Sequence, residues 1–266
     1  MKKCVFFIPF LFMVYTRLQR KKAILHYILT FPLAWILMTV FEQSFDVFRM
    51  FLSFVYLYSI YEIGYLQNDC ETIKRETTPT MRVTYHDLSF YEKYKILIYA
   101  FRICTIFSLA LIMYILGIKL SVILFPICIS PVFYFYNIIR GELNLYIHLI
   151  LAILKHATIV FITLNEFQWS AIVWLFLYHP LCFFVELNVK GKAGYKNPLF
   201  EKLFIPVYDK YHVHKFRVYY QILFLFISLS LVAIGFFPEY YLIGNVVYTV
   251  LMIITFKLFG KHNEML

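Results

Sequence analysis

Oxygen-bearing side chains gather directly after the second apolar run of the sequence, as Asn68, Asp69, Thr72 and Glu76. Residues three, four or seven positions apart stack on one face of a helix, so we expect these four to share a face. Carboxylate and amide oxygens are the ligands of a hard cation such as Mg²⁺, and water and substrate phosphates usually complete its shell. The pattern therefore predicts a Mg²⁺ site built from Asn68, Asp69 and Glu76.

Basic residues accompany this acidic group. Lys74, Arg75 and Arg82 are placed to meet the remaining charge of a bound phosphate. Glu62 extends the acidic face into the apolar run, where a carboxylate is costly and is usually functional. Pro79 is expected to end the helix and to keep the acidic face compact. An ordinary polar helix end at the membrane surface is the alternative interpretation.

Long apolar segments must position these residues. The 266 residues are 62% hydrophobic and only 15% charged, whereas soluble domains contain about 25% charged residues. Apolar runs of about 18 or more residues indicate membrane spans. We predict eight, at 23–41, 47–66, 95–117, 119–137, 146–164, 169–187, 218–237 and 240–258. The expected fold is an all-α, polytopic membrane bundle of about eight transmembrane helices, in one domain over 1–266, with a central cavity opening to the cytoplasmic side.

Lys and Arg concentrate on one side of the predicted bundle. The short links after the first, third, fifth and seventh spans carry almost none, whereas both ends of the chain and the segments 67–94 and 188–217 carry nearly all. The positive-inside rule then places both termini in the cytoplasm and requires an even number of spans. Segment 1–22 begins like a signal peptide but lacks a small-residue cleavage site. We expect it to be retained as an interfacial segment, with a cleaved signal as the alternative.

Ionisable side chains also lie inside the predicted spans. His148 and Lys155 share a face of the fifth span, and Arg102 lies in the third. A charge at mid-membrane is expensive unless it faces a cavity or a partner. We therefore expect Lys155 to face a polar central cavity, with snorkelling to the interface as the alternative; for Arg102 both interpretations are open. The sequence contains no paired-cysteine metal motif and no Walker-type motif, so neither a zinc site nor an ATP-driven pump is supported.

The polar segment after the second run resembles the first motif of the UbiA superfamily of intramembrane prenyltransferases. That family carries Asn-Asp-x-x-Asp-x-x-x-Asp at the cytoplasmic end of its second helix, often followed by Pro and Arg. This chain has Asn68, Asp69, Thr72 and Glu76 at the four positions, then Pro79 and Arg82. The second acidic position is lost and the last is conservatively changed. The resemblance extends to the element of Tyr136 and Arg140 at the end of the fourth span.

The second motif of that family follows the sixth span and is usually rich in Asp. Here the corresponding segment contains Glu186, Lys190, Lys192 and Tyr195. It is more similar to the Lys- and Tyr-containing version of the decaprenyl-phosphate phosphoribosyltransferase branch. By this resemblance Glu186 is a further metal ligand and the other three contact phosphate, while positive-inside topology is the alternative reason for the lysines.

The resemblance implies a Mg²⁺-dependent membrane transferase that acts on a prenyl diphosphate or polyprenyl phosphate. Asp69, Glu76 and Lys190 are the expected catalytic residues; the expected substrate-binding residues are Asn68, Lys74, Arg82, Tyr136, Arg140, Lys192 and Tyr195. Phosphoribosyl transfer from phosphoribosyl pyrophosphate is the alternative reaction. A transporter and a catalytically inactive lipid-binding relative are the alternatives of other classes. The expected location is a bacterial inner membrane, with membrane lipids and no nucleic acid as partners.

Overall fold

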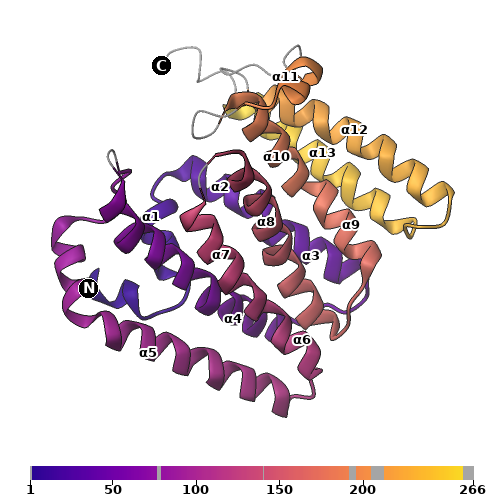
Figure 1. Cartoon of the computed structure of the whole chain (residues 1–266). Helices are drawn as coiled ribbons and strands as arrows, with labels where there is room; N and C mark the ends of the chain where they lie inside the picture. The colour runs from indigo at the N-terminus through magenta and orange to yellow at the C-terminus, as the bar shows by residue number, and fades with distance from the viewer. Residues whose placement is uncertain (1, 77–78, 140, 192–195, 205–212, 260–266) are drawn as a thin grey trace. The chain divides into compact units, whose positions relative to one another are not determined.

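Helices form all the regular secondary structure that the computed structural model describes, which covers residues 2–76, 79–139, 141–191, 196–204 and 213–259. The predicted all-α class is confirmed for these residues. The elements in Figure 1 are η1 (Lys2–Phe6), α1 (Leu11–Arg17), α2 (Lys21–Thr30), α3 (Pro32–Phe41), α4 (Val47–Leu66), η2 (Gln67–Glu71), η3 (Thr72–Arg75), α5 (Tyr85–Ile115), α6 (Leu120–Leu124), η4 (Phe125–Cys128), α7 (Ile129–Ile138), α8 (Glu142–Leu164), α9 (Trp169–Tyr178), α10 (Pro180–Lys190), α11 (Pro198–Phe204), α12 (Val213–Ala233) and α13 (Tyr240–Phe259).

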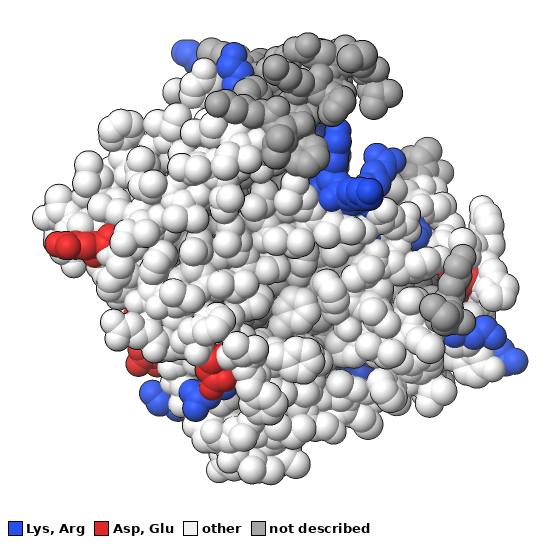
Figure 2. Space-filling view, turned by 180° about the vertical axis from the view of Figure 1, so that it is seen from behind, with Lys and Arg blue, Asp and Glu red and all other residues white. Residues whose placement is uncertain are grey.

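Among the described residues, six helical segments are long and apolar enough to cross a membrane. They are Lys21–Phe41, Tyr85–Ile115, Leu120–Ile138, Glu142–Leu164, Trp169–Lys190 and Lys215–Ala233. These segments support a multi-pass membrane protein, and much of the face in Figure 2 is free of charged side chains. The two other predicted spans form helices α4 and α13 but do not belong to this set. The predicted number of eight spans is therefore not shown.

The chain forms two compact units. Unit 1 comprises Met1–Ile139 and Leu154–Phe167, and unit 2 comprises Arg140–Ile153 and Gln168–Leu266, so helix α8 contributes to both. In unit 1, α4 packs against α1, α5 and α7. It approaches α7 closely at Gly64, where an added Cβ would lie 2.2 Å from the ring of Phe133. The Gly64 carbonyl also accepts a hydrogen bond of 3.0 Å from the Asn137 amide, so glycine permits both contacts.

The N-terminal segment is packed inside unit 1. Phe6 of η1 and Phe12 of α1 have no exposed surface, and they form one apolar cluster with residues of α4, η2 and α5. The ring of Phe6 lies 5.7 Å from that of Phe90 and 6.3 Å from that of Tyr91, between centroids. The interfacial position expected for 1–22 stays a prediction, and the aromatic side chains of Phe6 and Phe12 help to build the core between α4 and α5.

A fully buried ion pair holds this segment. Arg102 Nη1 donates to Glu62 Oε2 at 2.9 Å, and both side chains have no exposed surface. Arg102 Nε also donates to the carbonyl of Phe6 at 2.9 Å, and Glu62 Oε1 accepts from the backbone N–H of Met13 at 2.7 Å. The pair thus satisfies the backbone on both sides of the break between η1 and α1, as a low-dielectric interior requires. Arg102 therefore has a partner, and neither snorkelling nor a cavity explains it.

Two of the candidate spans are broken by a residue that precedes proline. Phe31 separates α2 from α3 with φ −127° and ψ −71°, and His179 separates α9 from α10 with φ −143° and ψ −45°. Pro32 and Pro180 lack the N–H that would continue the helical bonding, and proline disfavours the helical conformation in the residue before it. Each unit therefore contains an apolar helix interrupted in this way, and in unit 1 the 3₁₀ turn η4 also divides the candidate span Leu120–Ile138.

In unit 2, side chains of α12 satisfy the carbonyls that the break in α9–α10 leaves open. The Tyr220 hydroxyl donates to Leu177 O at 2.8 Å, and the Gln221 amide donates to Tyr178 O at 2.9 Å. Helices α12 and α13 form the most extensive helix pair of this unit. The Asn245 amide of α13 bonds the Ser228 hydroxyl of α12 at 2.5 Å inside that pair. Buried hydrogen bonds between side chains hold helices together where no water is available.

We predict that Gly64→Ala destabilises unit 1, because the buried ring of Phe133 must move to admit the methyl group. Overpacking of this kind costs about 1–3 kcal/mol. The melting temperature in detergent should fall, and adding Phe133→Leu should recover part of the loss. An unchanged melting temperature for Gly64→Ala would contradict the close approach of α4 and α7.

We also predict that Arg102→Met is more damaging than the double variant Glu62→Gln/Arg102→Met. The single change leaves a buried carboxylate without its cation, which costs about 3–5 kcal/mol, whereas the double change removes the charge and keeps an acceptor for Met13. Denaturant unfolding of the two variants in the same detergent checks the order. Equal stability of the two would show that the charge of Glu62 is not held by Arg102.

Candidate functional site

The predicted acidic face begins where helix α4 ends. The chain leaves α4 at Leu66, makes a π-helical turn over Gln67–Glu71 and then a 3₁₀ turn over Thr72–Arg75. Glu76 follows with extended backbone, at φ −90° and ψ 136°. The expected continuous helix through Asn68, Asp69, Thr72 and Glu76 is therefore wrong, because both turns change the number of residues per turn. Single π-helical turns occur frequently at functional sites.

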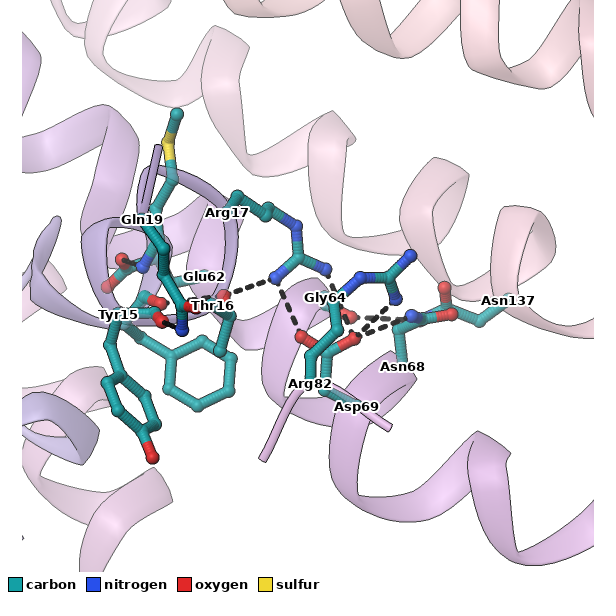
Figure 3. A network of polar contacts seen from close by, with 12 residues as sticks. Tyr15, Thr16, Arg17, Gln19, Glu62, Gly64, Asn68, Asp69, Arg82 and Asn137 are labelled. Carbon is teal, nitrogen blue, oxygen red and sulfur yellow. Dashed lines mark hydrogen bonds and ion pairs between the residues drawn. The ribbon is translucent and has the colours of Figure 1, made fainter. Parts of the chain in front are cut away.

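The carboxylate of Asp69 is the centre of this region, as Figure 3 shows. Its side chain is fully buried and accepts bonds from two guanidinium groups. Arg17 donates at 2.6 Å to Oδ2 and at 3.2 Å to Oδ1, and Arg82 donates at 3.1 Å to Oδ1. The Asn68 amide donates to Oδ1 at 2.8 Å. We call Arg17, Asn68, Asp69 and Arg82 the Asp69 cluster.

This geometry does not fit the predicted Mg²⁺ site. Both oxygens of Asp69 already accept bonds, and two positive groups lie within 3.2 Å of them. The Asn68 amide presents its donor side to the carboxylate, rather than an oxygen to a cation. No group of three or more His, Cys, Asp or Glu suited to a metal occurs in the described part of the chain. With one carboxylate and two guanidinium groups, the Asp69 cluster carries a net positive charge and suits an anion.

An aromatic wall adjoins the Asp69 cluster. The guanidinium carbon of Arg17 lies 3.6 Å from the ring centroid of Tyr65. Tyr65 contacts Tyr61 and Phe133 at centroid distances of 5.1 and 5.4 Å, and Tyr136 lies 5.7 Å from Phe133. Helix α1 thus brings the cation of Arg17 to aromatic rings of α4 and α7, and aromatic faces attract cations. The predicted residue Tyr136 belongs to this wall.

Other acidic residues of this segment have cationic partners of their own. Glu71 forms ion pairs with Lys95 and with Lys74, the latter at 2.9 Å, and accepts from the Tyr91 hydroxyl at 2.9 Å. Lys74 also pairs with Glu92. Lys74, expected to bind phosphate, is therefore engaged by two carboxylates. Glu76, expected as a metal ligand, follows the 3₁₀ turn, and the bonds to Asp69 come instead from Arg17, Arg82 and Asn68.

Lys155 of α8 lies in an aromatic box formed within unit 1. Its Nζ is 3.8 Å from the ring centroid of Phe31, and 5.1, 5.6 and 5.7 Å from those of Tyr27, Tyr58 and Tyr61. Within the described ranges no carboxylate pairs with it. The rings therefore take the place of a counter-ion for this charge, beside the break at Phe31. The polar central cavity that we expected around Lys155 is not shown.

The predicted residues of the second motif that are described lie in unit 2. Glu186 of α10 is buried and accepts two bonds from Arg217 of α12, at 3.1 and 3.0 Å to the same oxygen. Lys190 is exposed at the end of α10. The structure thus gives Glu186 a protein cation as its partner, rather than a metal. Arg140, Lys192 and Tyr195 lie outside the described residues.

Sequence reasoning assigned Arg17 to membrane topology and missed its bond to Asp69. The two residues are 52 positions apart, and no local pattern links them. Arg217 was likewise counted only as a topological charge. The sequence did indicate one buried pair. Glu62 and Arg102 each stand inside an apolar run, where a charged side chain needs a partner, and the structure pairs them with each other.

Comparisons of this chain with protein-family models, with curated proteins and with solved structures find no match.

We predict an acid-sensitive contribution of Glu71 to stability. Burial acts to raise the pKa of Glu71, but hydrogen bonds from Lys95, Lys74 and Tyr91 outweigh it and lower the pKa from 4.5 to about 2. A lowered pKa means that the ionised form stabilises the folded state, fully above the unfolded value of 4.5 and less as the pH falls toward 2. The difference in melting temperature between the wild type and Glu71→Gln should be constant near neutral pH and shrink below about pH 4.5.

The exposed Glu166 provides a matched control as Glu166→Gln, which should change the melting temperature little at any pH. A difference for Glu71→Gln that stays the same down to about pH 2 would contradict the ion-paired geometry.

Proposed function

We propose that this chain is a multi-pass membrane transferase that binds the phosphate group of a prenyl or polyprenyl substrate at the Asp69 cluster. The single observation that carries the proposal is the pairing of a fully buried carboxylate with two guanidinium groups that are themselves partly exposed. The side chain of Arg17 is 20% exposed to solvent, and that of Arg82 is 36% exposed. Each guanidinium has five N–H donors, so both can bind a phosphate while they remain bonded to Asp69.

The aromatic wall beside the Asp69 cluster favours a substrate whose phosphate is attached to an apolar chain. Tyr61, Tyr65 and Phe133 continue from the Asp69 cluster along α4 and α7. An isoprenoid chain is apolar and rich in double bonds, and aromatic faces also stabilise positive charge on carbon. A phosphate at Arg17 and Arg82 with its chain along these rings is the arrangement that we propose.

The proposed chemistry is electrostatic. A nucleophilic acceptor bonds to the carbon of the transferred group as the bond between that carbon and the phosphate or diphosphate oxygen breaks, and the acceptor releases its proton. The departing phosphate or diphosphate gains negative charge, and Arg17 and Arg82 neutralise it. Preorganised donors aimed at a developing charge are commonly the largest single contribution to catalysis. Asp69 would act as a positioning residue, because it holds both guanidinium groups in place. No catalytic step is assigned to Mg²⁺, since the Asp69 cluster does not fit that ion.

We predict that Arg82→Gln weakens binding of a polyprenyl phosphate about 10- to 100-fold, because one charge-assisted hydrogen bond is lost. Binding is measured with purified protein in nanodiscs. The matched control is Arg49→Gln, which removes a partly exposed arginine paired with Asp46 at the other end of α4. Equal affinity of the wild type and Arg82→Gln would contradict the proposal.

We further predict that Asp69→Asn retains or strengthens binding of the polyprenyl phosphate in the presence of a chelator. Loss of the carboxylate frees both guanidinium groups and raises the positive charge of the cluster by one unit. If a metal bridged the carboxylate and the phosphate, the same variant and the chelator would each abolish binding. Labelled prenyl diphosphate and labelled phosphoribosyl pyrophosphate then distinguish the two transfer reactions; consumption of neither would identify a lipid-binding relative without transferase activity.

A secondary transporter is the second candidate, and the interrupted helices are the observation that favours it. Each unit has an apolar helix broken before a proline, at Phe31 in unit 1 and at His179 in unit 2. Broken helices in the two halves of a transporter commonly mark its binding site. Flux of a labelled water-soluble phosphate ester into proteoliposomes, without its chemical conversion, would favour this candidate over the transferase.

A further inference from the structure

An apolar groove of about 600 Å³ lies in unit 1 between α4, α5 and the segment from α6 to α7. Its lining includes Ile60, Ile63, Ile106, Ala110, Ile123 and Ile127. Large side chains on its α5 side are open to the surroundings, with Phe107 72% and Leu111 60% exposed. The volume lies within the range of about 300–1,000 Å³ that is common for ligand sites. The chemistry of this lining fits a hydrocarbon chain.

A second pocket, of about 470 Å³, adjoins the groove. Ile63 and Ser130 line both. The other residues of the second pocket are polar, charged or aromatic, and come from η2, η3, α5 and α7: Gln67, Glu71, Arg75, Lys95, Tyr99 and Tyr134. We call this second pocket the headgroup pocket. The two neighbouring hollows thus place an apolar lining next to a polar one.

The charges of the headgroup pocket favour an anion. Glu71 already forms ion pairs with Lys95 and Lys74 and accepts a hydrogen bond from the Tyr91 hydroxyl. Arg75 is exposed and has no ion pair among the described residues. The pocket thus contains two cations against one engaged carboxylate, and the Tyr134 hydroxyl adds a donor, whereas the Tyr99 hydroxyl donates to that of Tyr91. Basic pockets between transmembrane helices commonly bind the headgroups of anionic lipids.

We propose that this site binds an anionic phospholipid, with one acyl chain in the groove and its phosphate against Arg75 and Lys95. The proposal goes beyond the transferase function, because the headgroup pocket and the Asp69 cluster have no residue in common. Glu71 and Asp69 lie two positions apart in the same π-helical turn. An occupied lipid site would therefore brace the turn that carries the Asp69 cluster.

Native mass spectrometry of the purified protein with phosphatidylglycerol and phosphatidylcholine tests the proposal. The wild type should retain phosphatidylglycerol about five-fold better, and Arg75→Gln should reduce that preference toward unity. Ala110→Phe, which fills the groove, should lower retention of both lipids. Ala110 is only partly buried, and a melting curve confirms that this variant folds.

Two matched variants make the result specific. Arg49→Gln removes the same charge outside the site, and Arg82→Gln removes a cation of the Asp69 cluster; both should keep the preference for phosphatidylglycerol. Equal retention of the two lipids by the wild type would overturn the proposal. So would a preference that Arg49→Gln reduces as much as Arg75→Gln does, because that result would indicate general charge attraction.

Discussion

The buried pair of Glu62 and Arg102 determines how unit 1 is built. Neither side chain has exposed surface, so each needs the other to be tolerated in an apolar interior. The pair also binds the backbone at Phe6 and Met13, which lie on either side of the break between η1 and α1. The N-terminal segment is thereby held against α4 and α5. Helix α1 ends at Arg17, so this anchoring brings a guanidinium to Asp69.

Each acidic residue of α4 and its following turn has a cation from a distant part of the chain. Glu62 has Arg102, Asp69 has Arg17 and Arg82, and Glu71 has Lys95. A segment that is acidic in sequence therefore becomes neutral or positive in the folded protein. This reversal removes the basis for a cation site at Asp69 and supports anions on two sides of the turn. The positive charge at Asp69 arises from tertiary contacts alone. Two guanidinium groups from other parts of the chain meet one carboxylate, so one positive charge is left over.

Apolar periodicity predicted the helices well, and the site less well. The bounds expected for the second span, 47–66, are those of α4, and Pro79 follows the last helical turn of the segment. The π-helical turn at Gln67–Glu71 changed the face on which Asp69, Thr72 and Glu76 lie. No residue type in this turn predicts a π-helical conformation. Arg17 was beyond sequence reasoning for another reason. Its partner is 52 residues away, and a topological role accounts equally well for any arginine near a membrane surface.

Photo-cross-linking from position 6 tests the central claim that the buried pair holds the N-terminal segment against α5. A diazirine-bearing phenylalanine analogue replaces Phe6, whose ring lies 5.7 Å from Phe90 and 6.3 Å from Tyr91. In lipid nanodiscs the account predicts an intramolecular cross-link to the peptide that contains these two residues, and its loss when Arg102 is replaced by methionine. Cross-linking of the wild-type segment to lipid, with no product at Phe90 or Tyr91, would contradict it.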